Sequence, residues 1–362
     1  MPRLPVRSLP RIHLTDDLIY LIMLRLPVST LSRFVVLCRQ WEATITSKKF
    51  VTEHFLNEGN QTHLLICWNA SILLRGGHAF SLFRDETLKS YEEPVDFTLA
   101  GNFSWIYGPS NGVFLLTINT LNRLALWNPA TRSLRPLPPP QYFDSEDDAL
   151  GFMVDPTSLL MNYRALRHSF IERSTCGITP LDGWFYWKMY AMEIRKFSVL
   201  GFDTSNEDFH EIEIPVAAQS REEVKVEVAT YKGRLALLTF HYEGIEIWLK
   251  DAENLWTMNS KLDVRPKKFM EALGFWEENL VYTLMTKKDK LKVVLHDLNT
   301  HTRRVVGFAQ RDVKSSYLAT ISIFHYRESL VSLKDKALGI KVLDMKSAEA
   351  RDFFSSRRRA DA

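Results

Sequence analysis

Apolar residues recur at helical spacing through the amino-terminal part of the chain. Leu18, Ile22 and Leu26 lie four residues apart, so they share one face of a helix. The hydroxyl group of Thr15 can cap the start of this helix. Pro27 ends it, because proline disfavours a helical conformation in the residue before it. The pattern therefore predicts an amphipathic helix over residues 15–26.

Further short helices are predicted before residue 57. Ser29 can cap a second helix, Trp41 and Ile45 lie four apart in a third, and Ser47 can cap a last helical turn. The apolar positions of the second helix are spaced three and four apart and comprise Leu31, Phe34, Val35, Leu37 and Cys38. Helices this short bury little apolar surface by themselves, so this segment needs a partner.

Runs of branched and aromatic residues bounded by Gly, Pro, Asn or Asp replace the helical spacing after residue 60. The best predicted strands cover residues 63–68, 79–83, 113–118, 124–127, 224–228, 235–240, 245–249, 281–284, 291–295, 317–324 and 330–333. Several strands are followed by a turn residue whose side chain can accept backbone hydrogen bonds and close a hairpin. These residues are Asn128, Asp203, Asp251, Asp297 and Asp344, and the last four recur about 47 residues apart. A repeat of this length is typical of β-propeller blades.

One repeat is too short. About 75 residues separate Asn128 from Asp203, where two repeats need about 94. We therefore predict an α+β multidomain chain, with a small helical domain before an all-β propeller-like domain of six or seven blades, one truncated near residues 165–190. The expected divisions are a leader at 1–12, the helical domain at 13–57, the propeller-like domain at 58–349 and a polar basic tail at 350–362. Truncation leaves the closure of the ring open to question.

The helical segment carries residues in the order and spacing of a known module: Leu14, Asp17-Leu18, Ile22, Leu26-Pro27-Val28, Leu31, Arg33-Phe34, Leu37-Cys38-Arg39, Trp41, Ile45 and Phe50. It resembles the F-box, which docks onto the Skp-type adaptor of cullin-RING ubiquitin ligases. The resemblance implies adaptor contacts by Leu14, Leu18, Ile22, Leu26, Pro27, Leu31, Phe34, Leu37, Cys38 and Trp41. Some of these, Trp41 among them, can instead hold the helices together. The family opens with Leu-Pro where this chain has Leu14-Thr15, which implies weaker docking.

The repeated part resembles the plant F-box-associated interaction domain, and within that family it looks most like the self-incompatibility-locus group. The matching stretches are residues 105–108, 110–112, 126–131, 137–138, 151–152, 162–164, 202–203, 207–209, 214–215, 247–249, 256 and 326–333. The family continues after Tyr163-Arg164 with a further strand pair, whereas this chain runs from Arg167 almost directly to Trp184. The departure supports a truncated blade.

The two resemblances together imply the substrate-recognition subunit of an SCF-type (Skp-cullin-F-box) E3 ubiquitin ligase, which is not itself an enzyme. The expected partners are a Skp-type adaptor, through it a cullin-RING ligase, and an unknown substrate protein, with no nucleic acid and no membrane. We expect the protein in the cytoplasm, the nucleus or both. The alternative is a non-ligase interaction scaffold with a degenerate F-box, which Leu14-Thr15 and the short repeat favour.

Composition adds few constraints. A formal charge of +3, from 46 basic and 43 acidic residues, is not typical of a nucleic-acid-binding protein. The three cysteines, Cys38, Cys67 and Cys176, have neither disulfide nor zinc spacing, which fits a reducing compartment. The sequence has no apolar segment of membrane-spanning length and no glycine-rich phosphate loop, so we predict no cofactor and no metal.

Candidate catalytic signals are weak. Residues 108–112 match the G-x-S-x-G nucleophile pattern around Ser110, but a strand rather than a helix is predicted after them. His296 and His301 lack partners at metal-ligand spacing and are expected at the surface. The aromatic cluster at residues 184–190 is expected in the core, because alternate positions of a strand would bury most of its rings. We therefore predict no catalytic residue.

Overall fold

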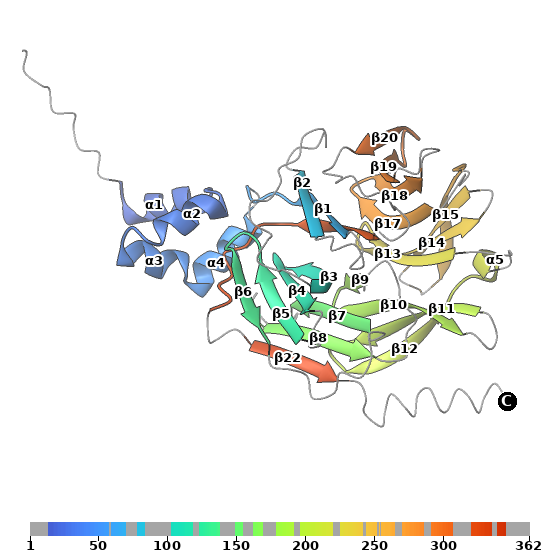
Figure 1. Ribbon diagram of the computed structural model, residues 1–362, viewed down its shortest axis with the longest axis horizontal. Helices are drawn as coiled ribbons and strands as arrows, with labels where there is room; N and C mark the ends of the chain where they lie inside the picture. Colours follow the sequence, from blue (N-terminus) through green and yellow to red (C-terminus); the bar gives the residue numbers. More distant parts are fainter. Residues whose placement is uncertain are drawn as a thin grey trace, which may run out of the picture.

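The structure is a computed structural model. It describes residues 14–57, 59–69, 78–83, 103–118, 123–137, 149–154, 162–168, 179–191, 196–219, 225–241, 244–251, 253, 255–264, 270–285, 291–306, 320–334 and 339–344. Figure 1 shows the amino-terminal helices beside a ring of sheets. The helices are α1 (Asp16–Met23), α2 (Val28–Phe34), α3 (Arg39–Ile45) and α4 (Lys48–Leu56). A short helix, α5 (Val216–Gln219), lies on the far side of the ring.

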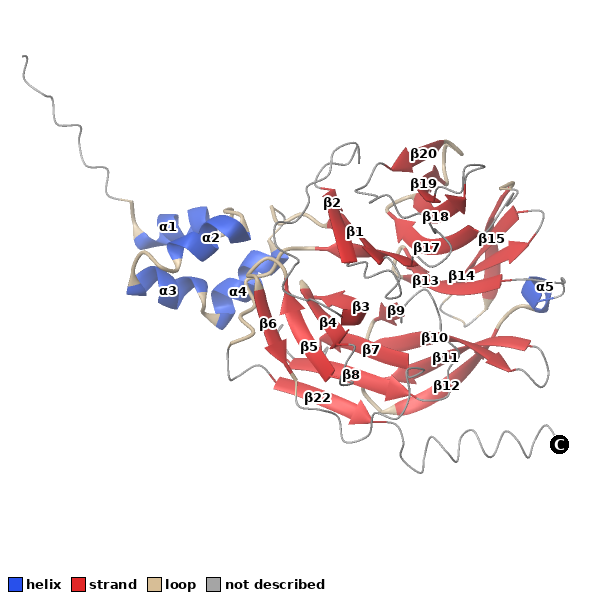
Figure 2. Cartoon of the chain, viewed as in Figure 1, coloured by secondary structure: helices blue, strands red, loops and turns tan. Residues whose placement is uncertain are grey.

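Four sheets of the ring have four antiparallel strands each (Figure 2). The first two contain β3 (Phe103–Ser110), β4 (Val113–Ile118), β5 (Arg123–Asn128) and β6 (Ser133–Pro136), and β9 (Thr179–Leu181), β10 (Trp184–Ala191), β11 (Lys196–Asp203) and β12 (Asp208–Glu213). The other two contain β13 (Lys225–Tyr231), β14 (Arg234–His241), β15 (Gly244–Lys250) and β16 (Trp256–Leu262), and β17 (Met270–Trp276), β18 (Asn279–Met285), β19 (Leu291–Asp297) and β20 (Arg303–Val306). In each sheet, strands that are consecutive in the chain pair with each other, as in a propeller blade.

Two sheets have three strands each in the described part of the chain. One orders β2 (His78–Phe83), β1 (His63–Asn69) and β21 (Thr320–Tyr326), so the start of the β domain pairs with its last third. The other orders β22 (Gly339–Asp344), β8 (Asn162–His168) and β7 (Ala149–Val154). Strand β22 runs parallel to β8 and comes from the carboxyl-terminal part of the chain. This second sheet has only two strands of its own where the repeat spacing is short.

The ring is closed. Strands β21, β3, β7, β9, β13 and β17 contact one another in that cyclic order, and the antiparallel pairing of β21 with β1 joins the two ends of the domain. The predicted propeller fold is therefore confirmed. The described residues form four complete four-stranded blades and two three-stranded sheets, so the count of complete blades differs from the predicted six or seven. In the described part of the chain, each of the two three-stranded sheets has only two strands that are consecutive in sequence, and its third strand comes from the carboxyl-terminal part.

The recurring Asp and Asn residues close turns, as the sequence predicts. One side-chain oxygen of each accepts a hydrogen bond from the backbone nitrogen two residues on. The pairs are Asn128 with Ala130 (3.1 Å), Asp203 with Ser205 (2.8 Å), Asp251 with Glu253 (3.0 Å) and Asp297 with Asn299 (2.8 Å). Asp344 ends β22, and its side chain lies outside the described part.

Three sequence predictions need correction or completion. Residues 330–333 do not form a strand, because they leave the sheet and pack between the helices and β3–β6. His296 is 2% exposed rather than at the surface, because it lies on β19 beside Tyr282. The aromatic cluster of β10 is divided, with Phe185 and Trp187 buried and Trp184 and Tyr186 only half-buried.

Ser110 does not lie on a nucleophile elbow. It ends β3, a two-residue turn follows, and β4 begins at Val113. Across the described ranges, no group of three His, Cys, Asp or Glu side chains is arranged to hold a metal ion. The helices described in the structure are all too short or too polar to cross a membrane.

Candidate adaptor-binding site

Side chains at the helix starts explain where three of the four amino-terminal helices begin. The Thr15 hydroxyl accepts a hydrogen bond from the Leu18 backbone nitrogen at 3.4 Å, and Ser47 caps α4 through the Phe50 nitrogen at 3.2 Å. The Cys38 sulfur accepts from the Trp41 nitrogen at 3.5 Å at the start of α3. The Thr15 and Ser47 caps match the sequence prediction.

The predicted cap at Ser29 is wrong. Helix α2 begins at Val28 and its N-cap residue is Pro27, which makes no side-chain cap hydrogen bond. The Pro27 carbonyl oxygen accepts instead from the backbone nitrogens of Thr30 and Leu31. The backbone of Pro27 is extended, with φ −59° and ψ 150°, so the helix begins at the next residue.

The helices share a small core. Its buried members are Met23, Val28, Leu31, Ile45, Phe50 and Val51. Phe34 and Trp41 pack ring against ring with centroids 4.9 Å apart, and Tyr20 meets Phe50 edge-on at 5.2 Å. The Tyr20 hydroxyl donates a hydrogen bond to Glu53 at 2.7 Å, and burial together with this carboxylate raises the pKa of Tyr20 to about 12.

Apolar side chains on α1 and just before it face solvent. Leu14, Leu18 and Ile22 follow one another at four-residue spacing and are 46%, 44% and 44% exposed. We call these three residues the α1 apolar face. Leu37, between α2 and α3, is 64% exposed. Helices α1, α2 and α3 extend away from the ring, whereas α4 lies beside it (Figure 2). The α1 apolar face is therefore exposed to solvent in the structure.

The ten residues predicted to contact an adaptor divide into three groups. Leu14, Leu18, Ile22, Pro27, Leu37 and Cys38 are exposed, and Leu26, Phe34 and Trp41 are half-buried. Leu31 is fully buried and packs inside the helical core, so it serves folding rather than contact. Sequence reasoning did not single out Leu21 and Val36, which are also exposed beside these residues. In the sequence, only their position next to Leu18, Ile22 and Leu37 could have indicated Leu21 and Val36.

One apolar core joins the helices to the propeller. The buried residues of α2, α3 and α4 belong to the same cluster as Val113, Leu115, Leu124 and Leu126 of the β3–β6 sheet. The segment 327–333, which follows β21, lies between the two parts and contributes Leu330, Val331 and Leu333 to the cluster. We call it the junction segment.

Hydrogen bonds hold the junction segment on both sides. Arg327 donates from Nη1 to the carbonyl oxygen of Phe55 in α4 at 3.0 Å, and Asn60 donates from Nδ2 to the carbonyl oxygen of Glu328 at 2.9 Å. On the propeller side, the buried Asn128 amide donates to the carbonyl oxygens of Ser329 and Val331 at 3.0 and 2.9 Å. The orientation of the helices on the propeller is therefore determined by specific contacts.

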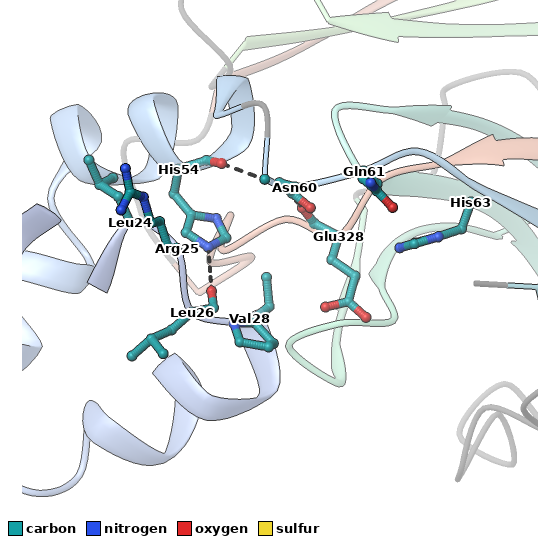
Figure 3. A pocket seen from close by; sticks show the side chains of 11 residues that line it. Leu24, Arg25, Leu26, Val28, His54, Asn60, Gln61, His63 and Glu328 are labelled. Carbon is teal, nitrogen blue, oxygen red and sulfur yellow. Dashed lines mark hydrogen bonds between the residues drawn. The ribbon is translucent and has the colours of Figure 1, made fainter. Parts of the chain in front are cut away.

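A cavity of about 150 Å³ lies at this junction, lined by Leu24, Arg25, Leu26, Pro27, Val28, His54, Gly59, Asn60, Gln61, His63 and Glu328 (Figure 3). His54 is buried, and its Nε2 atom lies 2.8 Å from the Leu26 carbonyl oxygen. A carbonyl oxygen only accepts hydrogen bonds, so Nε2 carries the proton. Burial lowers the pKa of His54 below its ordinary value, which keeps the ring neutral.

Comparisons with known proteins agree with this architecture. The model of the F-box associated beta propeller domain family matches residues 160–331. An F-box protein of Arabidopsis thaliana is 26% identical over 286 residues, which cover 68% of this chain and 71% of the relative. An Arabidopsis thaliana F-box/kelch-repeat protein is 27% identical over 292 residues, which cover 66% of this chain and 71% of the relative. The Arabidopsis thaliana F-box protein CPR1 is 24% identical over 366 residues, which cover 85% of this chain and 84% of the relative.

Solved structures match less closely. The β-propeller domain of the Trilobed protease from Pyrococcus furiosus aligns at a TM-score of 0.36 and 8% identity, over 69% of this chain and 80% of that chain. The likeness to the self-incompatibility-locus group stays a prediction. The domain model and the named relatives therefore show that this chain is similar to plant F-box proteins with an F-box-associated β-propeller domain.

Proposed function

We propose that this protein is the substrate-recognition subunit of an SCF-type ubiquitin ligase. Its F-box helices bind a Skp-type adaptor, which connects it to a cullin-RING ligase, and its propeller holds the protein to be ubiquitinated. The complex would work in the cytoplasm, the nucleus or both. The chain contributes no nucleophile or base, because the thioester chemistry belongs to the ubiquitin-conjugating enzyme.

The observation that carries the proposal is the α1 apolar face. Leu14, Leu18 and Ile22 remain exposed although the same helices bury Leu31 and Phe50 completely. Removing a large apolar side chain from water contributes about 1.5–3 kcal/mol, so a partner that covers these residues gains substantial binding energy. Large buried side chains of this kind dominate protein interfaces.

Proximity accounts for the activity of the whole complex. A substrate held on the propeller is confined near the conjugating enzyme, which raises the effective concentration of its lysine side chains. The junction segment supports this role, because its contacts with Phe55 and Asn128 connect the helices to the ring without a free linker in the described residues. Confinement of the substrate is greatest when the connection is rigid.

The experiment is a binding titration between the purified chain and a recombinant plant Skp-type adaptor. We expect the double variant Leu18→Glu with Ile22→Glu to weaken binding at least 100-fold, because it places two charges in an apolar interface. Both residues are exposed, so the substitutions leave the folded core intact. They are a sharper test than changing Leu26, whose side chain is half-buried and packs against the helical core.

The matched control is Val216→Glu with Leu255→Glu. These residues are exposed and apolar too, but they lie on the propeller, in α5 and before β16. The control should bind the adaptor like the unmodified chain. Equal affinity of the F-box variant and the control would refute the proposed adaptor site. A folded, unmodified chain that does not bind the adaptor would instead support the alternative of an interaction scaffold with a degenerate F-box.

A further inference from the structure

Three aromatic side chains gather at one end of the β9–β12 sheet. Trp184 and Tyr186 lie on β10 with ring centroids 6.0 Å apart and ring planes only 11° from parallel. His210 on β12 lies 5.2 Å from the Trp184 ring. Phe185 and Trp187 are buried on the opposite face of the same strand. The cluster is therefore the half-buried side of a strand whose other side belongs to the core.

A glycine makes room for these rings. Gly201 pairs with Tyr186 across the sheet, and a Cβ atom there would lie 3.2 Å from the Tyr186 ring and 3.3 Å from the Trp184 ring. The residue two positions before the turn Asp or Asn is leucine in three other repeats, at positions 126, 249 and 295. Among these four sheets, only the β9–β12 sheet has glycine instead of leucine at this position, and aromatic rings cover that glycine.

Carboxylates surround the cluster. Asp203 pairs with Trp184 across the sheet, and Asp208 pairs with Asp203 on the next strand. Asp182 is exposed in the turn before Trp184. The side chains of Asp208 and His210 are also exposed, with 3.8 Å between Asp208 Oδ2 and His210 Nε2. In the described part of the chain no lysine or arginine forms an ion pair with these three carboxylates, so their charge is available to a partner.

The aromatic rings and the carboxylates favour the same kind of ligand. The face of an aromatic ring carries partial negative charge and attracts cations within about 6 Å of its centre. Burial and then the negative charges of Asp182 and Asp203 raise the pKa of Tyr186. A planar guanidinium group can stack on a ring and donate two parallel hydrogen bonds to a carboxylate, which an ammonium group cannot do.

We propose that Trp184, Tyr186 and His210, together with Asp182 and Asp208, bind the guanidinium group of an arginine side chain on a partner protein. That the partner is the protein to be ubiquitinated rests on the proposed function. Strands β10, β11 and β12 lie away from the four helices (Figure 1), so this site and the α1 apolar face can be occupied together.

The experiment uses the full chain labelled with 5-fluorotryptophan. The Trp184 resonance is assigned from the spectrum of the Trp184→Phe variant. The probes are three peptides with the same Gly-Ser flanks and a central arginine, lysine or citrulline, of which citrulline has the shape of arginine without its charge. We expect the arginine peptide to shift the Trp184 resonance saturably, with at least tenfold higher affinity than the citrulline or lysine peptide.

A variant that leaves the packing intact separates binding from a merely structural role of the rings. Asp208→Asn removes one exposed charge and should weaken arginine binding three- to tenfold. Glu253→Gln removes one exposed charge in the turn between β15 and β16 and should leave binding unchanged. Equal affinity for the arginine and citrulline peptides, or equal binding by the two variants, would overturn the proposal, and equal affinity for lysine would overturn the choice of arginine. Adaptor binding is measured separately, so failure here is distinct from failure of the ligase proposal.

Discussion

Arg327 holds Phe55 at the base of the helices. Its Nη1 atom donates a hydrogen bond to the Phe55 carbonyl oxygen at 3.0 Å, and its guanidinium carbon lies 5.6 Å from the centre of the Phe55 ring. Arg327 directly follows β21, which closes the ring by pairing with β1. Arg327, which follows the strand that closes the ring, therefore also holds the last of the amino-terminal helices, α4.

The first prediction concerns this contact. Arg327→Ala should lower the free energy of local opening of α4 by about 1–3 kcal/mol, because it removes a charge-assisted hydrogen bond and a cation–ring contact. Hydrogen exchange of the α4 amides, compared with the β14 amides, measures this difference. The control Arg39→Ala removes an exposed arginine from α3 and should leave the exchange of α4 unchanged. Unchanged exchange in Arg327→Ala would show that apolar packing alone holds the helix.

The second prediction concerns Asn128. Its amide donates to two carbonyl oxygens of the junction segment, and its own oxygen accepts from Ala130. Asn128→Ala should lower the free energy of unfolding by about 2–4 kcal/mol, because buried carbonyl groups lose their partners. Asn128→Asp should cost more, since it replaces the donor by a negative charge facing those oxygens. Urea unfolding measures both, and an aspartate variant as stable as the unmodified chain would contradict the assigned hydrogen bonds.

The third prediction compares two glycines that occupy equivalent hairpin turns. Gly112 and Gly233 have backbone φ angles of +75° and +69°. A Cβ atom at Gly112 would lie 2.5 Å from the Ser329 Cβ atom, whereas nothing lies within 4 Å of one at Gly233. Gly233→Ala should cost about 1 kcal/mol from backbone strain alone. Gly112→Ala should cost at least about 2 kcal/mol more, because the junction segment must move.

Urea unfolding at one pH measures the difference between the two glycine variants. Equal destabilisation would mean that the junction segment moves without an energetic cost and does not position the amino-terminal helices. A larger loss at Gly112, accompanied by faster hydrogen exchange in α4, would show that the turn after β3 supports the helices. The comparison is matched because both turns share the same backbone conformation.

The fourth prediction concerns His296. Both of its ring nitrogens are buried without a hydrogen-bond partner in the described part of the chain. Burial, then the charges of Arg303 and His301, lower its pKa below the ordinary value. The unfolded chain then binds more protons below pH ~6.5, so stability is fully present above that pH and falls as the pH drops toward the lowered native pKa.

His296→Leu should therefore raise the free energy of unfolding by about 1 kcal/mol at pH 7.5, because it replaces a buried polar group without a partner. It should also reduce the loss of stability between pH 7.5 and pH 5.5. Urea unfolding of the variant and the unmodified chain at both pH values measures the two effects. An unchanged loss between the two pH values would show that other groups, His54 included, cause the acid sensitivity.

Local features of the fold could be predicted because neighbouring residues produce them. The caps at Thr15 and Ser47, the Asp and Asn turns and the repeat of strands depend on contacts within a few residues. The same holds for the α1 apolar face, whose spacing is visible in the sequence. The prediction failed for residues 330–333, where an apolar run suited to a strand packs instead against the helices. Such a contact joins distant parts of the chain and leaves no local pattern.

Asn128 shows most clearly which properties the sequence determines and which the tertiary structure determines. By itself the sequence determined that position 128 closes a hairpin, since Asn and Asp share the oxygen that accepts the Ala130 hydrogen bond. Only the tertiary structure decided that an amide is required there, because Ser329 and Val331 bring carbonyl oxygens that need a donor. Their partner lies about two hundred residues away in the chain, and long-range hydrogen bonds of this kind depend on ring closure rather than on local spacing.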